Sequence, residues 1–152
     1  MKPPAERTLV ENRKARHDYD LTDTFEAGVA LRGSEVKSLR GGRGNLREAY
    51  VQMRPDGAWL MQCHISPYEQ ANINNHEPTR ARRLLLHRHE LSKLKKATAE
   101  RGMTIVPTRL YLKGSLIKLE IAVGRGRKSY DKRHALKAKD AKREMDRARR
   151  GG

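Results

Sequence analysis

The chain has 152 residues, with 34 Lys and Arg against 18 Asp and Glu, and a formal net charge of +16. Its single cysteine, Cys63, excludes an internal disulfide framework and is compatible with a reducing cytosol. No apolar run approaches the ~20 residues that span a bilayer, and the start lacks the apolar segment of a signal peptide. We therefore expect a cytoplasmic protein with no membrane partner and with a polyanionic partner.

Charge and patterning predict three parts: a basic N-terminal segment over 1–17, a folded domain over 18–123 and a basic tail over 124–152. The tail carries twelve Lys and Arg against four acids. Ala138, Ala141, Met145 and Ala148 fall on one helical face, and three of the four are alanine. Such a small face cannot offset an ordering cost of about 1 to 2 kcal/mol per residue. We expect the tail to be disordered when free and helical when bound to phosphate; the alternative is a tail that serves solubility only.

The first half of the folded domain is predicted to contain three strands and a short helix. Residues 19–31 alternate between apolar and polar, which predicts a long, bent strand. Gly33-Ser34 offers an N-cap for a helix of about two turns that ends at Gly41-Gly42. Residues 46–54 and 58–65 form two strands around a turn at 55–57. The second strand is expected to bury Trp59, Met61, Cys63 and Ile65 on one face, so Cys63 is a small buried hydrophobe and not a reactive thiol.

The second half is predicted to hold a loop, a short strand, a helix and a hairpin. Residues 66–79 form a surface loop, and Leu84–Leu86 form a short strand. A helical face of Leu91, Leu94 and Thr98 ends at Gly102. Strands over 103–113 and 116–123 enclose the turn Gly114-Ser115, and a shift in the apolar phase across Pro107 predicts a bulge or an edge.

These elements indicate a mainly β protein: an antiparallel, six-stranded, closed or nearly closed barrel of the oligonucleotide-binding type, with flanking helices. A two-layer α+β sheet is the competing architecture. Barrels of this type present one strand face and its loops to nucleic acid, which fits the charge.

Catalytic and metal-binding signals are weak. His87 and His89 lie in a basic stretch that would repel a cation, and no Cys pair has ligand spacing, so we expect neither a metal nor a cofactor. The glycine-rich stretches at 41–44 and 124–126 lack the Lys-Ser/Thr of a phosphate-binding loop. No Ser, His and Asp grouping supports an enzyme. Composition alone therefore indicates an RNA- or DNA-binding module with a basic tail.

Five segments, in order along the chain, resemble the bacterial SsrA-binding protein (small protein B) family. They are ENRKARHDY at 11–19, FEAGVAL at 25–31, GSEVKSLR at 33–40, RLLLH at 83–87 and DKR at 131–133. The resemblance implies a non-enzymatic, monomeric partner of transfer-messenger RNA (tmRNA) in trans-translation, the rescue of stalled ribosomes. It also implies an oligonucleotide-binding-like barrel that holds the tRNA-like domain of tmRNA. The further partners implied are the small ribosomal subunit and, through aminoacyl-tmRNA, elongation factor Tu.

Matched position by position, the family's RNA-binding residues correspond to Glu26, Leu85 and Lys118 and, in the N-terminal motif, to Asn12. The remaining residues expected at the RNA are basic: Arg13, Lys14, His17, Lys37, Arg40, Arg82 and Arg83. Lys118 lies on the polar face of its strand and can contact phosphate. Glu26 can accept a hydrogen bond from a base amino group, or it is a surface charge that balances Lys37 or Arg40. Leu85 is either a base contact or a core residue, which the pattern does not separate.

The resemblance assigns the tail to the decoding centre and the empty mRNA channel, where it folds as a helix. Asp131-Lys132-Arg133 matches a functional motif of the family, and Tyr130 before it is placed to stack on a ribosomal base. The tail residues expected to contact the ribosome are Tyr130, Asp131, Lys132, Arg133, Lys137, Lys142 and Arg143. Two alternatives remain open: a general single-strand-binding or ribosomal protein with the same barrel, and an RNA-acting enzyme.

Overall fold

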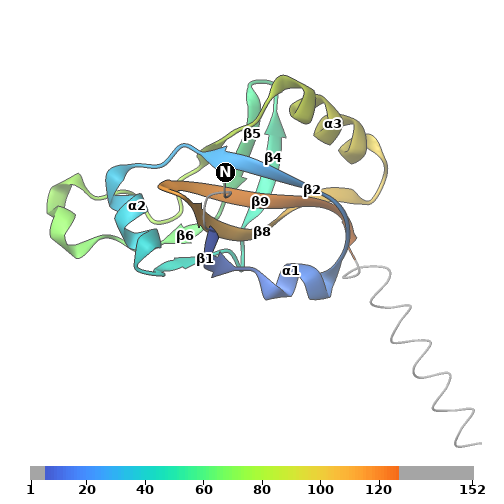
Figure 1. The fold of residues 1–152 in the computed structure, drawn as a ribbon. Coiled ribbons are helices and arrows are strands. Elements are labelled where there is room, and N and C mark those ends of the chain that lie inside the picture. The colour runs from blue at the N-terminus through green and yellow to red at the C-terminus, as the bar shows by residue number, and fades with distance from the viewer. Residues whose placement is uncertain (1–5, 127–152) are drawn as a thin grey trace, which may run out of the picture.

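The computed structural model describes residues 6–126, and Figure 1 shows how their elements are arranged. In chain order, these are β1 (Glu6–Glu11), α1 (Arg13–Asp18), β2 (Tyr19–Val29), α2 (Gly33–Arg40), β3 (Gly44–Asn45), β4 (Tyr50–Arg54), β5 (Gly57–Met61), β6 (His64–Ile65), the 3-10 helix η1 (Glu69–Asn74), β7 (Arg82–Leu85), α3 (Arg88–Ala99), β8 (Met103–Lys113) and β9 (Leu116–Gly126). The mainly β class with flanking helices is confirmed.

Seven strands form one curled antiparallel sheet in the order β1-β8-β9-β2-β7-β5-β4, and β3 pairs with β6 in a second small sheet. The prediction of six strands was wrong, because it omitted β1. The sheet is also not closed by hydrogen bonds. β1 pairs only with Arg109–Lys113 of β8, and β4 lies beside the other half of β8 without pairing with it. The molecule is therefore an open barrel with a seam between β4 and β8.

The predicted long strands are confirmed. In β9 the apolar residues Ile117, Leu119, Ile121 and Val123 all point into the core. The register of β2 shifts between Leu21 and Thr24, which bends it. The register of β8 shifts between Pro107 and Arg109, so the phase change marks a bulge. It also marks where the pairing with β1 ends: residues 103–107 pair with β9 alone, whereas residues 109–113 pair with both β9 and β1. β9 continues to Gly126, three residues past its predicted end at Val123, so it includes the first three residues of the predicted tail.

The strand predicted over 58–65 is divided in two, and its predicted face was wrong. Gln62 has a φ of 56°, a left-handed conformation that ends β5 at Met61. Ala58 is buried in β5, whereas Trp59 and Met61 lie on the other, half-buried face. After Gln62 the alternation of inward and outward side chains shifts by one residue, so that Cys63 faces the core, as Ala58 does. Cys63 is fully buried, as predicted, and this burial raises the pKa of its thiol to about 11.

One local prediction needs correction. The N-cap of α2 is Arg32, whose backbone N–H donates to Glu35 Oε1 at 2.7 Å, and not Gly33-Ser34. The basic N-terminal segment forms β1 and most of α1. Asn12 begins α1 by accepting the Ala15 N–H on its side-chain oxygen at 3.2 Å.

The core lies inside the curled sheet and is covered at its ends by helices. Leu39 of α2 and Leu94 of α3 are fully buried against strand residues such as Leu60 and Leu119. Figure 1 shows α1, α2 and α3 at separate positions around the sheet, which leaves the outer faces of β2 and β9 uncovered. Within residues 6–126, no helix is long and apolar enough to cross a membrane.

Candidate nucleic-acid interface

Three strands place Leu85, Gly28 and Lys118 in one row across the outer face of the sheet. Gly28 of β2 pairs with Leu85 of β7 on one side and with Lys118 of β9 on the other. Their chain neighbours Ala27 and Leu84 point inward and are buried, so the row points outward. The three residues are far apart in sequence, and the sheet alone brings them together.

Leu85 belongs to the surface and not to the core. Its side chain is 57% exposed, whereas Leu84 is 3% exposed. A Cβ at Gly28 would lie 3.1 Å from Leu85 Cβ, so the glycine gives Leu85 room. Around them is a hollow of about 400 Å³ that also includes Lys118. An exposed leucine beside a partly exposed lysine is suited to a ligand that has both an apolar face and an anionic group.

Glu26 lies one outward position along β2 from Gly28, and it is held as a carboxylate. It accepts a hydrogen bond from the Tyr111 hydroxyl and another from Lys113 Nζ at 3.2 Å. The Tyr111 hydrogen bond lowers the pKa of Glu26, burial opposes this, and Lys113 adds to the lowering. Burial and the same bond raise the pKa of Tyr111. The predicted balance with Lys37 or Arg40 was wrong, because the partners of Glu26 come from β8.

Tyr111, which is not among the predicted site residues, also belongs to this face. Tyr111 pairs with Lys118 across β8 and β9, and the Arg109 guanidinium lies 4.1 Å from its ring centroid. Only 2% of Tyr111 is exposed, because neighbouring side chains cover the ring. A tyrosine within an apolar run gives no sequence signal for this role, since its partner Glu26 lies 85 residues away along the chain.

Arg82 was wrongly expected to contact phosphate. Its side chain is 0% exposed and hydrogen-bonds Glu35, while its Nη1 donates to the Cys63 carbonyl at 2.6 Å. Arg80 Nη2 also donates to Glu35, at 2.5 Å. Arg82 therefore joins β7 to α2, whereas the adjacent Arg83 is exposed on the outer face.

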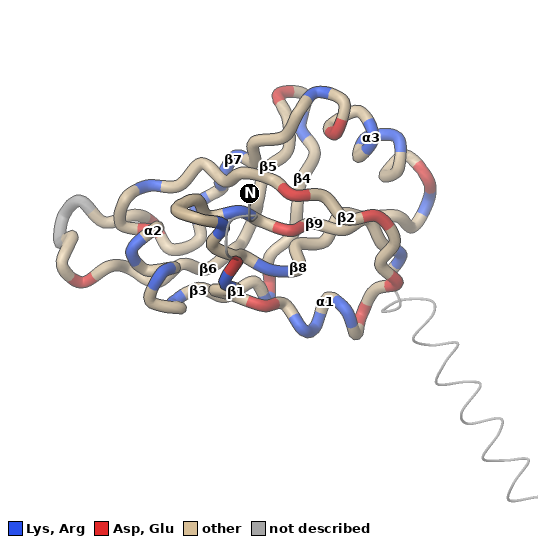
Figure 2. Tube along the Cα trace, in the orientation of Figure 1, with Lys and Arg blue, Asp and Glu red and all other residues tan. Residues whose placement is uncertain are grey.

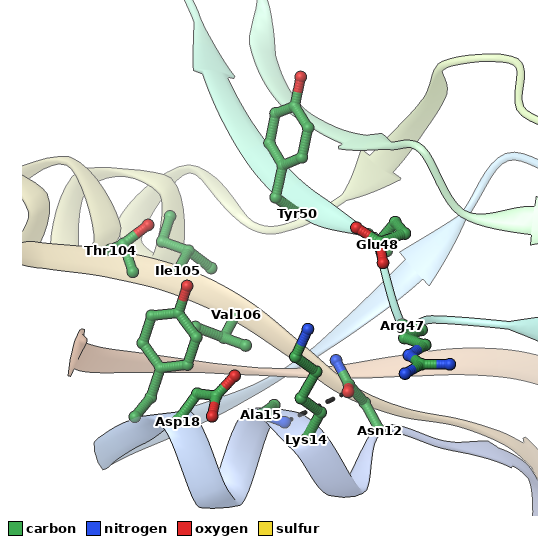
Figure 3. Close-up of a pocket in the computed structure, with 12 residues that line it drawn as sticks. Asn12, Lys14, Ala15, Asp18, Arg47, Glu48, Tyr50, Thr104, Ile105 and Val106 are labelled. Atoms are coloured by element: carbon green, nitrogen blue, oxygen red, sulfur yellow. Dashed lines mark hydrogen bonds between the residues drawn. The ribbon is translucent and has the colours of Figure 1, made fainter. Parts of the chain in front are cut away.

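The predicted residues of the N-terminal motif lie elsewhere. Tyr19, where α1 meets β2, is nine residues from Gly28, or roughly 30 Å along an extended strand. Figure 3 shows a pocket between α1, the segment before β4, and β8, into which Lys14 points and which Arg47 borders. Arg13 and His17 are exposed on α1. The structure thus separates the predicted residues into two sites.

Asn12 is buried and organises this pocket from within. Its Nδ2 donates to the carbonyls of Pro107 at 2.8 Å and Leu46 at 3.3 Å. Its side-chain oxygen caps α1, as the dashed line in Figure 3 shows. A side chain with these bonds acts by positioning α1 and not by direct contact with a ligand.

Lys37 and Arg40 are exposed on α2, where the Lys37 amine lies 5.3 Å from the Tyr68 ring centroid. Figure 2 shows Lys and Arg spread along α1, α2 and α3, and not confined to one face of the barrel. The tail residues predicted to contact the ribosome lie outside the described residues. Within 6–126, no three His, Cys, Asp or Glu side chains gather as a metal site would require.

An open antiparallel barrel with short flanking helices, a basic surface and an uncovered strand face defines a small β-barrel protein of the nucleic-acid-binding class. The family model of the SmpB protein matches residues 9–151. The chain belongs to the SmpB family.

Curated relatives and a solved structure agree with this assignment. SsrA-binding proteins from Staphylococcus epidermidis (strain RP62A) and Symbiobacterium thermophilum are 53% and 54% identical to the chain. Those alignments cover 93% and 94% of this chain and 90% and 91% of the relatives. A solved structure described as "tmRNA-SmpB: a journey to the center of the bacterial ribosome" is 39% identical, with a TM-score of 0.66, and the match covers 86% of this chain and 89% of that one.

Proposed function

We propose that this protein binds the tRNA-like domain of tmRNA through the outer face of β7, β2 and β9, and delivers it to stalled ribosomes in trans-translation. One observation carries the proposal: in a chain of the SmpB family, Leu85 is exposed and aligned with Lys118 across Gly28. The names of the relatives and of the similar structure support the same partners.

The chemistry of this face suits structured RNA. Leu85 offers an apolar surface for an unstacked base, and Lys118 offers an amine to a phosphate. Glu26, kept ionised by Tyr111 and Lys113, can accept hydrogen bonds from a base amino group, as its position on the outer face allows. Arg83 on β7, together with Lys37 and Arg40 on α2, adds positive charge that attracts the phosphates of the RNA backbone.

A second contact with RNA is proposed at α1. Arg13, Lys14 and His17 reach phosphates from its exposed side, while Asn12 holds the helix against β8. Two separated contacts fix the orientation of the protein on its RNA, whereas a single contact would not.

For the tail we propose contact with the decoding centre and the empty mRNA channel through Tyr130, Asp131, Lys132 and Arg133, with Lys137, Lys142 and Arg143 following. Replacing Asp131 and Lys132 by alanine should spare tmRNA affinity and abolish tagging of stalled products. Loss of tmRNA affinity would contradict this division between barrel and tail.

The proposal includes a monomeric protein in the cytoplasm that acts by binding and not by catalysis, with elongation factor Tu as a partner through aminoacyl-tmRNA. Turnover of a labelled RNA by the purified protein would contradict the non-enzymatic role.

The decisive experiment measures affinity for the tRNA-like domain and for an unrelated single-stranded RNA at near-physiological salt. We expect the tRNA-like domain to bind more tightly, and Leu85→Ala and Lys118→Gln each to weaken it by about tenfold, the effect of a lost contact of about 1.4 kcal/mol. Arg101→Gln, in the exposed turn between α3 and β8, is the control. Equal affinity for both RNAs would instead indicate a general single-strand-binding protein.

A further inference from the structure

Beside the Leu85 row, two arginines lie within interaction distance of one tryptophan. In the register, Trp59 of β5 pairs with Arg83 of β7 on one side and with Gln52 of β4 on the other. The guanidinium carbon of Arg54, two residues along β4 from Gln52, lies 5.1 Å from the ring centroid of the indole, and that of Arg83 lies 6.0 Å away. Both distances are typical of cation–π contacts. These three residues are called the arginine–tryptophan cluster below.

Hydrogen bonds fix the cluster to the turn between β4 and β5. Trp59 Nε1 donates to Asp56 Oδ1 at 3.0 Å, and Arg83 Nη2 donates to the Asp56 carbonyl at 2.6 Å. Arg54 Nε donates to Gln52 Oε1 at 3.0 Å. The turn thereby holds an indole and two cations on the surface before any ligand arrives, which lowers the entropy lost on binding.

Neither guanidinium of the cluster is ion-paired within the described part of the chain. No carboxylate oxygen of residues 6–126 lies within 4.0 Å of the Arg54 or Arg83 guanidinium as an ion pair. A guanidinium held over an aromatic ring keeps N–H groups at its edge for bidentate bonds to phosphate. Lys113, by contrast, is already paired with Glu26.

The cluster is continuous with the proposed RNA face. Arg83 lines the same hollow as Leu85 and Lys118, and Asp56 and Gly57 of the turn complete that hollow. An RNA that covers Leu85 would therefore lie against Arg83, and its backbone would extend over β5 toward Arg54.

We propose that the arginine–tryptophan cluster binds the sugar–phosphate backbone of the RNA held at Leu85, with Arg54 and Arg83 each contacting a phosphate and Trp59 keeping both in place. This inference rests on the proposed function, and it adds Arg54 and Trp59 to that site. An acidic protein segment is a different partner, which the tests below separate from RNA.

The first test compares the salt dependence of binding to the tRNA-like domain for Arg54→Gln, Arg83→Gln and the control Arg101→Gln. Each cluster variant should lower affinity by about tenfold, as loss of a charged hydrogen bond does. It should also reduce the slope of log affinity against log salt by about 1, because one fewer phosphate is neutralised. Arg101→Gln should leave affinity and slope unchanged. Slopes that stay at the wild-type value in both cluster variants would overturn the inference.

The second test uses the wild-type chain, because Trp59 is its one tryptophan. Binding of the tRNA-like domain should change the Trp59 emission, and the change should saturate together with binding. Poly-glutamate should neither reproduce the change nor compete with the RNA. Unchanged emission on saturation with RNA, or effective competition by poly-glutamate, would overturn the inference.

The two proposals fail in different ways. If the wild-type protein does not prefer the tRNA-like domain, the proposed function fails. If it does, and Lys118→Gln weakens binding while both cluster variants bind and respond to salt as wild type, only the cluster assignment fails.

Trp59→Leu tests whether Trp59 positions the two arginines. The substitution should weaken RNA binding in the wild-type background and have little further effect when Arg54 and Arg83 are both Gln. An equal loss in both backgrounds would overturn the positioning role of Trp59.

Discussion

At the scale of single residues, the most consequential interaction is the buried ion pair of Glu35 and Arg82. Burial opposes ionisation of Glu35, but hydrogen bonds from Arg80, the Arg32 N–H and Arg82 outweigh it, so the pKa of Glu35 falls below its ordinary value. The pair connects α2 to β7, and removing one partner would leave the other as an uncompensated buried charge. It therefore supports the strand that presents Leu85 and Arg83.

We predict that Glu35→Ala destabilises the fold by about 3 to 5 kcal/mol at neutral pH. Because the folded pKa of Glu35 is lowered, its contribution is complete above the ordinary value of 4.5 and is lost as the pH falls through the lower, folded value. The difference between wild type and variant should shrink over that acidic range, as measured by denaturant unfolding. Glu100→Ala, which removes an exposed partner of Arg125, should cost less than about 1 kcal/mol at any pH. A pH-independent difference for Glu35→Ala would contradict the assignment.

At the scale of elements, Gln62 decides how the strand after the β4–β5 turn is divided. Its φ of 56° places it in the left-handed region, which costs a non-glycine residue roughly 1 to 2 kcal/mol. The kink resets the alternation, so that β5 exposes Trp59 to its arginines while Cys63 and Ile65 still reach the core. A straight strand could not satisfy both.

We expect Gln62→Gly to stabilise the protein by about 0.5 to 1 kcal/mol, because glycine adopts this backbone conformation without a steric cost but loses more entropy on folding. Gln62→Val, which is β-branched, should destabilise it. Thermal and denaturant unfolding of the three proteins measures both effects. A Gln62→Gly variant less stable than wild type would show that the Gln62 side chain stabilises the fold by more than its left-handed backbone conformation destabilises it.

At the scale of the whole molecule, the open seam makes the barrel unevenly protected. β9 lies between β8 and β2 and is hydrogen-bonded on both sides, whereas β4 is paired only with β5. The proposed RNA face is built on the well-paired strands β2 and β9. The seam lies between β4 and β8, near the α1 pocket.

Native-state hydrogen exchange should follow this order. Amides of Leu119 and Ile121 in β9 should exchange at the slowest rates, near those of global unfolding, and amides of β4 should exchange much faster through local opening. Addition of the tRNA-like domain should protect β7 more than β4's free edge. Equal protection of β4 and β9 in the free protein would indicate that the seam is closed in solution.

The sequence by itself determined the alternation of β2 and β9, the turn at 55–57, the irregularity near Pro107 and the family, because these depend on local periodicity and short motifs. Only the tertiary structure decided that Arg82 is buried and Arg83 exposed, since adjacent residues of the same type differ only in which face of β7 they occupy. It also decided that Leu85 is a surface residue, because Gly28 on a distant strand gives it space. Alternation separates two faces of a strand, and long-range packing selects which of them meets the solvent.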